Sequence, residues 1–191
     1  MNRRTGIKGI LALGIVGASS FSIFKYLNLK KTPDIKQLIA RKGLIAELAE
    51  TIIPRTDTPG AKDAKVEDYI IKIITDCTDV KNQNIFINGL ADVEDYSLSK
   101  FDKSFQKCSI GEKTQVLQHF EKKSHSFNGL VGKVEGKFLG EPFFTQLKKL
   151  TVTGYCTSEP GATQGLAYDF IPHNYDACIP LQPHQKSWAT Q

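Results

Sequence analysis

The sequence lacks the short motifs that usually mark an enzyme active site or a bound cofactor. It has no Cys-x-x-Cys-His stretch for covalent haem, and its four cysteines are too scattered for an iron–sulfur cluster. The histidines are dispersed, and no H-E-x-x-H motif is present. The glycines between residues 129 and 140 follow no β-rich strand, so they do not make a dinucleotide fingerprint. We therefore expect no flavin, haem or metal to be held by this chain itself.

Positive charge is scarce outside the N-terminal segment. The 191 residues carry a net charge of +5, and Arg3, Arg4 and Lys8 lie within a first stretch of twenty residues that contains no acid. Without these three charges the body carries only +2, and no basic stripe is interleaved with aromatic residues. Nucleic acid is therefore not an expected partner. The hydrophobic fraction of 40% and the charged fraction of 24% are ordinary for one globular domain.

Residues 1–32 are typical of an export signal followed by a linker. Residues 1–8 are basic, residues 9–20 are apolar, and the small residues 18–20 suit signal peptidase. Arg3 and Arg4, followed by Ile7 and Lys8, resemble a twin-arginine signal, although Gly6 occupies a place where that motif usually has a large apolar residue. The segment predicts an exported, periplasmic protein.

Two other interpretations of this segment remain open. The arginine pair could be accidental in a general export signal. The segment could also stay uncleaved as a membrane anchor, because apolar residues continue to residue 27. Lys25 interrupts that continuation, and the run before it is short of the roughly 20 residues that span a bilayer. The twin-arginine route carries folded proteins that often hold cofactors, so its use by a chain without a cofactor motif suggests that a cofactor-bearing partner travels with it.

Apolar residues recur at helical spacing through most of the body, and turn residues separate the periodic segments. We expect helices over residues 32–53, 66–77, 84–105, 109–123 and 141–154. Prolines at 160, 172, 180 and 183 interrupt helix formation beyond them. The expected fold is mainly α: an irregular domain of about five helices over residues 33–181, with a long extended, Pro-rich C-terminal tail ending in residues 182–191. We expect the tail to cross the helices, held by Tyr168, Phe170, Tyr175 and Leu181.

The most distinctive stretch is residues 48–61, LAETIIPRTDTPGA, where a helix meets a turn-rich loop. Pro54 lacks an N–H and restricts the residue before it, so the helix should end there. Asp57 could fold its carboxylate onto nearby backbone N–H groups, as in an Asx-turn. Pro59 and Gly60 fit a type II turn in which the glycine takes a positive φ. An ordinary helix stop is the simpler interpretation of the same residues.

Residues 51–61, TIIPRTDTPGA, closely resemble the signature of the gluconate 2-dehydrogenase subunit 3 family. A second match, GYCTSEPGA at residues 154–162, is followed by Tyr168, Pro172, Cys178 and Pro180. The resemblance covers roughly residues 38–181. It implies a small, exported, non-catalytic accessory subunit of a FAD-dependent sugar or sugar-acid dehydrogenase of the glucose–methanol–choline type. FAD, with haem as a further candidate, would then belong to partner subunits. Those partners would be the large flavoprotein and, as a second candidate, a cytochrome c, with peripheral or signal-anchored attachment to the membrane.

Both signature stretches are expected to be helix ends that run into rigid turns. We hypothesise that the two turns lie side by side and form or brace the surface that meets the flavoprotein. The candidate interface residues are Thr56, Asp57, Thr58, Thr157, Ser158 and Glu159. The turns could instead cap each other internally and only stabilise the fold. Asp57 and Glu159 could in principle form an acid pair, which would be the basis of a small enzyme. A third class is an exported structural or binding module that acts without an oxidoreductase.

An even number of cysteines in an exported chain favours disulfides. Three connectivities are possible, and we prefer Cys77–Cys108 together with Cys156–Cys178, because the second bond would fix the tail to the end of the last helix. A metal site made by Cys156, His173, Cys178 and His184 is the alternative, although these spacings match no close-paired zinc pattern.

Overall fold

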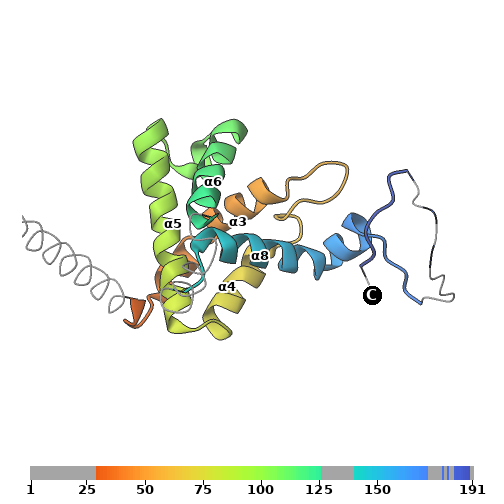
Figure 1. Cartoon of the computed structure of the whole chain (residues 1–191), viewed down its shortest axis with the longest axis horizontal. Coiled ribbons are helices and arrows are strands. Elements are labelled where there is room, and N and C mark those ends of the chain that lie inside the picture. The colour runs from red at the N-terminus through yellow and green to blue at the C-terminus, as the bar shows by residue number, and fades with distance from the viewer. Residues whose placement is uncertain (1–28, 126–139, 172–177, 179, 181–182, 190–191) are drawn as a thin grey trace, which may run out of the picture.

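The computed structural model describes residues 29–125, 140–171, 178, 180 and 183–189. This part of the chain is helical and contains no β-strand beyond one isolated bridge, so the predicted mainly α class is confirmed (Figure 1). The helices are α2 Ile35–Ala40, α3 Lys42–Ile52, α4 Val66–Asp76, α5 Val80–Phe101, α6 Ile110–His125 and α8 Phe143–Cys156. Two single turns are also present, η1 Phe105–Lys107 and η2 Gly161–Gly165. The export-signal residues Arg3 and Arg4 lie outside the described residues.

Helix α8 is the centre of the fold although it comes late in the sequence. It packs against α3, α4, α5 and α6, and in Figure 1 it runs from beside α5 toward the C-terminal tail. Phe143, at its first turn, contacts Phe86 of α5 and Phe120 of α6, with ring centroids 5.4 Å and 5.9 Å apart. The helices can approach because Gly89 of α5 has no side chain. A Cβ on Gly89 would lie 2.2 Å from Cγ of Phe143.

The helix expected over residues 32–53 is divided in two. Arg41 is the single residue between α2 and α3, and its backbone angles, φ −96° and ψ 17°, interrupt the helix. Its guanidinium Nη1 donates to the carbonyl oxygen of Ile87 on α5, at 3.2 Å. The prediction of one continuous helix was therefore wrong. The break lies at Arg41, whose side chain contacts α5, and the local apolar pattern gives no sign of it.

The ends of the next helices are set by side-chain caps. α5 begins four residues earlier than predicted, because Asp79 accepts hydrogen bonds from the backbone N–H groups of Lys81 and Asn82. The predicted capping box of α6 is present. The N–H of Ser109 donates to Oε2 of Glu112 at 2.7 Å, and the N–H of Glu112 donates to Oγ of Ser109 at 3.4 Å.

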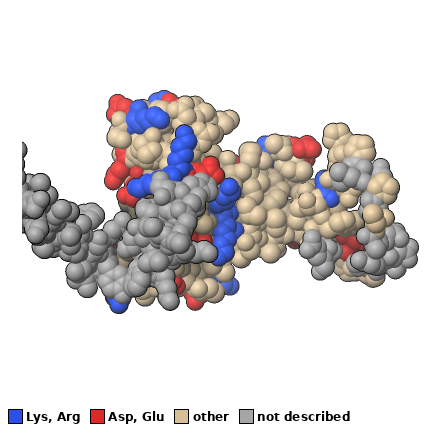
Figure 2. Space-filling view, in the orientation of Figure 1, with Lys and Arg blue, Asp and Glu red and all other residues tan. Residues whose placement is uncertain are grey.

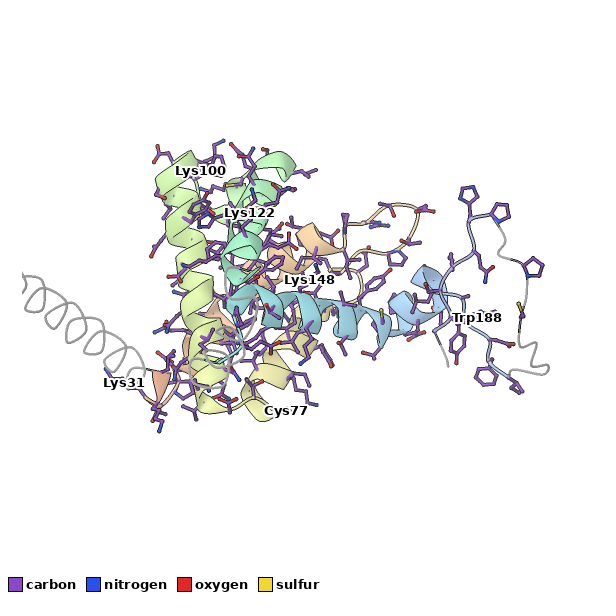
Figure 3. The ribbon with its side chains drawn as sticks, in the orientation of Figure 1. Lys31, Cys77, Lys100, Lys122, Lys148 and Trp188 are labelled. Carbon is purple, nitrogen blue, oxygen red and sulfur yellow. The ribbon has the colours of Figure 1, made fainter. Side chains whose placement is uncertain are left out.

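The structure contains neither of the preferred disulfides. All four cysteines are free thiols. Cys77 precedes α5 and Cys108 follows it, so the 22 residues of this helix separate them. A helix of that length spans about 33 Å, whereas a disulfide needs Cα atoms within about 7 Å. Cys77 and Lys100 lie at opposite ends of the bundle in Figure 3. Burial raises the pKa of the Cys108 thiol, which favours its neutral form inside the core.

The described part of the tail does not cross the helices. Its first residues form the helical turn η2, whereas an extended chain was expected. The chain then projects beyond the C-terminal end of α8, away from α5 and α6 (Figure 1). Tyr168 and Phe170 are exposed, so they do not hold the tail against the core as predicted. Tyr175 and Leu181 lie outside the described residues. Within the described ranges, no helix is long and apolar enough to cross a membrane.

Candidate functional site

The first signature stretch forms a closed loop after α3. Ile53 has φ −125° and ψ 86°, so the helix ends directly before Pro54, as predicted. The N–H of Ala61 then donates to the carbonyl oxygen of Ile53 at 3.0 Å. This bond brings the two ends of the loop together and leaves residues 54–58 at its outer edge, where four of the five are exposed.

Glu50, which the sequence did not single out, holds this loop together. Its Oε1 accepts from the N–H of Arg55 and its Oε2 accepts from the N–H of Lys62, both at 2.9 Å. Asp63 accepts from the N–H of Gly60 at 3.0 Å. Contrary to the prediction, the Asp57 carboxylate accepts from no backbone N–H group in the described part of the chain. Its Oδ1 accepts from the hydroxyl of Thr56 at 2.9 Å. The signal that could have indicated Glu50 is its place in the last turn of α3, next to the loop.

Gly60 is required for a reason other than the predicted one. Among the described glycines, only Gly140 has a positive φ, so Gly60 does not make the expected type II turn. A Cβ on Gly60 would lie 2.5 Å from Oε1 of Glu50 and 2.7 Å from the backbone nitrogen of Arg55. The glycine therefore leaves the space in which the Glu50 carboxylate reaches the backbone.

Tyr155, near the end of α8, joins the second stretch to the first. Its hydroxyl donates to the carbonyl oxygen of Pro59 at 2.8 Å, across 96 residues of sequence. Ser158 turns the chain after α8, because its Oγ donates to the carbonyl oxygen of Tyr155 and accepts from the N–H of Gly161. A Cβ on Gly161 would lie 1.9 Å from the Tyr155 carbonyl oxygen. The helical turn η2 therefore lies directly on Tyr155.

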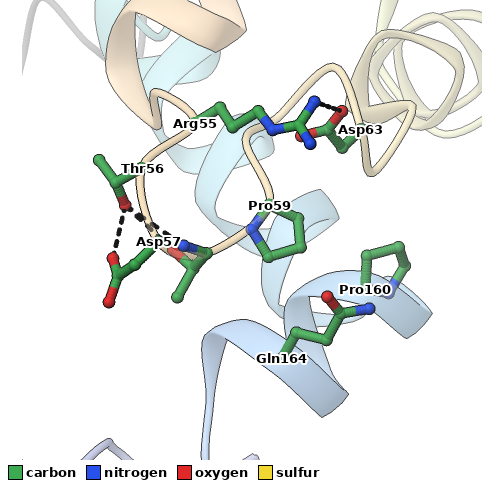
Figure 4. Close-up of a pocket in the computed structure, with 8 residues that line it drawn as sticks. Arg55, Thr56, Asp57, Pro59, Asp63, Pro160 and Gln164 are labelled. Atoms are coloured by element: carbon green, nitrogen blue, oxygen red, sulfur yellow. Dashed lines mark hydrogen bonds and ion pairs between the residues drawn. The ribbon is translucent and has the colours of Figure 1, made fainter.

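The two stretches lie side by side, as expected, and border an open hollow of about 360 Å³ (Figure 4). The first loop contributes Arg55, Thr56, Asp57, Thr58, Pro59 and Asp63. The second stretch contributes Pro160, and the turn η2 that follows it contributes Gln164. Three of the six candidate interface residues thus line the hollow.

The other three candidates do not line it. Thr157 donates its hydroxyl to the carbonyl oxygen of Thr153 at 2.8 Å, one turn back in α8. Ser158 is used by the internal hydrogen bonds around Tyr155. Glu159 is exposed, and its side chain makes no hydrogen bond or ion pair with another described residue. Internal capping therefore explains Ser158, whereas the outer edge of the first loop is left for other contacts.

The hollow is polar and open to solvent. Nη1 of Arg55 lies 3.5 Å from Oδ1 of Asp63, and the Arg55 side chain remains 73% exposed. The hydroxyls of Thr56 and Thr58 and the carboxylate of Asp57 complete its outer edge (Figure 4). These groups can donate and accept hydrogen bonds to a docked surface. No group of three or more His, Cys, Asp or Glu side chains that could hold a metal was found in the described ranges, and His173 of the alternative site lies outside them.

Replacing Glu50 by alanine should destabilise the fold. The change removes two hydrogen bonds to a carboxylate, each worth about 1.5–3 kcal/mol, although partial exposure of Glu50 reduces this worth. We expect a loss of about 2 kcal/mol and a melting temperature lower by roughly 4–8 °C. Glu50→Gln should lose less, because its amide keeps one acceptor oxygen. Thermal unfolding measures both. Glu159→Ala is the matched control, and an equal effect of Glu50→Ala and Glu159→Ala would contradict this role.

A comparison with known protein families finds a match that includes both stretches of the site. No curated protein and no solved structure matches the chain. Residues 40–173 match the family model described as gluconate 2-dehydrogenase subunit 3, and this range contains both turns and the helices that support them. The chain therefore belongs to the gluconate 2-dehydrogenase subunit 3 family.

Proposed function

We propose that this chain is a non-catalytic accessory subunit of an exported, FAD-dependent dehydrogenase of the glucose–methanol–choline type, which oxidises a sugar or sugar acid. In this proposal the flavin and the catalytic residues belong to the large partner subunit. The chain helps the flavoprotein to fold, to leave the cytoplasm or to dock in the periplasm. A cytochrome c is the candidate for a further subunit, which would receive the electrons.

The observation that carries the proposal is the family match over residues 40–173, because the family is named as a subunit of a dehydrogenase. The geometry of the hollow supports it. Glu50 and Asp63 bind backbone N–H groups, so these carboxylates stabilise the loop. A loop held in this way loses little conformational entropy when a partner docks, which makes its exposed edge a suitable recognition surface.

Co-purification tests the proposal. The full-length chain, tagged at its C-terminus, is purified from the periplasmic fraction of its own cells under mild conditions. We expect a larger protein to accompany it in a fixed ratio, with FAD absorbance and sugar or sugar-acid dehydrogenase activity in the same fraction. A chain that purifies without any flavoprotein would favour an exported binding module that acts alone.

Asp57→Ala should weaken binding to the flavoprotein without lowering stability. The Asp57 carboxylate is exposed and, among the residues that the structure describes, accepts only from the hydroxyl of its neighbour Thr56, so we expect a stability change within about 0.5 kcal/mol. Loss of its contacts in the complex should raise Kd about tenfold. Binding measured by calorimetry and thermal unfolding of the same sample distinguish the two effects.

The matched control for this variant is Asp92→Ala, because Asp92 is an exposed acid on α5, away from the hollow. It should leave both Kd and the melting temperature unchanged. If Asp57→Ala lowers the melting temperature by several degrees while the folded protein binds normally, the loop serves only the internal structure.

A further inference from the structure

Large apolar side chains are exposed together on the described part of the tail. Tyr168, Phe170, Ile171 and Trp188 have exposed fractions of 46%, 82%, 57% and 51%. We call these four residues the apolar arm. They lie beyond the C-terminal end of α8, where Figure 3 places Trp188. Exposed apolar residues gathered on one segment mark interaction sites more often than scattered single side chains do.

Hydrogen bonds hold the arm at its base, next to α8. The N–H of Ala167 donates to the carbonyl oxygen of Ser187, and the N–H of Ala189 donates to that of Ala167, both at 2.8 Å. Nζ of Lys186 donates to the carbonyl oxygen of Gln164 in η2, at 2.5 Å. These bonds connect the chain around Ala167 to residues 186–189, and both segments to the turn that lies on Tyr155.

The hydrogen bonds at the base of the arm also place it next to the hollow. A Cβ on Gly165 would lie 2.5 Å from the hydroxyl oxygen of Tyr155, the atom that also bonds to Pro59. Gln164 lines the hollow, and its carbonyl oxygen accepts from Lys186, two residues before Trp188 of the arm. A partner that covers the hollow would therefore also meet the base of the arm.

We propose that the apolar arm inserts its aromatic and aliphatic side chains into apolar pockets on the flavoprotein subunit and contributes a large part of the binding energy of that contact. This inference rests on the proposed function. Trp and Tyr are enriched among the residues that dominate binding energy, and charged residues are depleted at the centres of interfaces. Among the described atoms beyond α8 in Figure 2, tan predominates over blue and red, whereas charged residues are scattered over the helical body.

A protein partner suits the arm better than a lipid bilayer. The amide N–H groups of residues 168–170 make no hydrogen bond with another described residue, and lipid could not satisfy them. Asp169, between Tyr168 and Phe170, places a carboxylate where an anionic membrane surface would repel it. A protein can supply both backbone acceptors and a donor for this carboxylate.

The test uses the full-length chain and the FAD-dependent subunit that purifies with it. In the test variant Phe170, Ile171 and Trp188 are each replaced by serine. These side chains are exposed, so the melting temperature should stay unchanged. We expect Kd for the flavoprotein to rise about thirtyfold or more, the loss that truncation of one dominant interface residue produces. Ile110→Ser is the control, because Ile110 is 83% exposed on α6, far from the arm.

The outcomes separate this inference from the function on which it rests. If the unaltered chain binds no flavoprotein, both are wrong. If the unaltered chain and the triple variant bind with equal Kd, the accessory role stands and the arm proposal is wrong. Co-sedimentation with vesicles of phosphatidylethanolamine and phosphatidylglycerol is measured in parallel. Loss of vesicle binding in the variant, with unchanged Kd for the flavoprotein, would overturn the proposal and assign the arm to the membrane.

Discussion

Replacing Gly89 by alanine should lower the melting temperature of the protein by roughly 6–12 °C. A Cβ at this position would lie 2.2 Å from Cγ and 2.6 Å from Cβ of Phe143. A rotation of the Phe143 ring cannot relieve the clash, because the position of its Cβ is set by the backbone of α8. The two helices must move apart, which disturbs the packing of Phe86 and Phe120 around the same ring.

The expected loss in the free energy of unfolding is about 3 kcal/mol, the upper end of the usual cost of overpacking. For a chain of this size it gives the stated change in melting temperature. Thermal unfolding followed by circular dichroism measures it. The matched control is Gly111→Ala on α6, where an added Cβ would have no neighbour within 4 Å. Equal melting temperatures for Gly89→Ala and the unaltered protein would show that α5 and α8 are not in close contact here.

Changing Arg3 and Arg4 together to lysine should abolish export of both this chain and its flavoprotein partner. Lysine keeps the positive charge of the signal, but a receptor that recognises a twin-arginine pair would no longer bind it. If the partner has no export signal of its own, it should remain in the cytoplasm with the variant. Dehydrogenase activity in the periplasmic and cytoplasmic fractions measures this result.

Two further variants make this experiment specific. Lys8→Arg keeps the positive charge that follows the pair and should leave export unchanged. Deletion of the whole gene should give the same loss of periplasmic activity as the double lysine variant. If export of both proteins continues undiminished in the double variant, the chain uses the general route, and the proposal that it carries a folded partner fails.

Local signals predicted those parts of the fold that depend on neighbouring residues. Pro54 ends α3 because its ring restricts Ile53, and Ser109 and Glu112 begin α6 because they satisfy each other's N–H groups. The proximity of the two turns was a hypothesis, because both signature stretches were expected to run from the end of a helix into a Gly/Pro turn. The two helix ends could be predicted without knowledge of a distant contact. The proximity of the two turns could not, and it depended on the family resemblance.

The remainder depended on contacts between residues far apart in the sequence. The break at Arg41 accompanies a hydrogen bond to a carbonyl oxygen of α5, and the role of Gly60 is set by the carboxylate of Glu50. The preferred Cys77–Cys108 pair failed because the length of α5 separates its ends. The apolar arm was missed because aromatic residues in a tail were expected to pack on the core of the same chain.

The central claim is that the chain meets a flavoprotein through the hollow and the apolar arm, and hydrogen exchange of its backbone amides tests this most directly. Exchange is measured by mass spectrometry on the full-length chain, alone and in the purified complex. We predict slower exchange in the complex for peptides that cover residues 54–63, 158–171 and 183–189, with unchanged exchange in the middle of α5 and in α6. Protection confined to α5 and α6, with the loop and the arm exchanging as in the free chain, would contradict the claim.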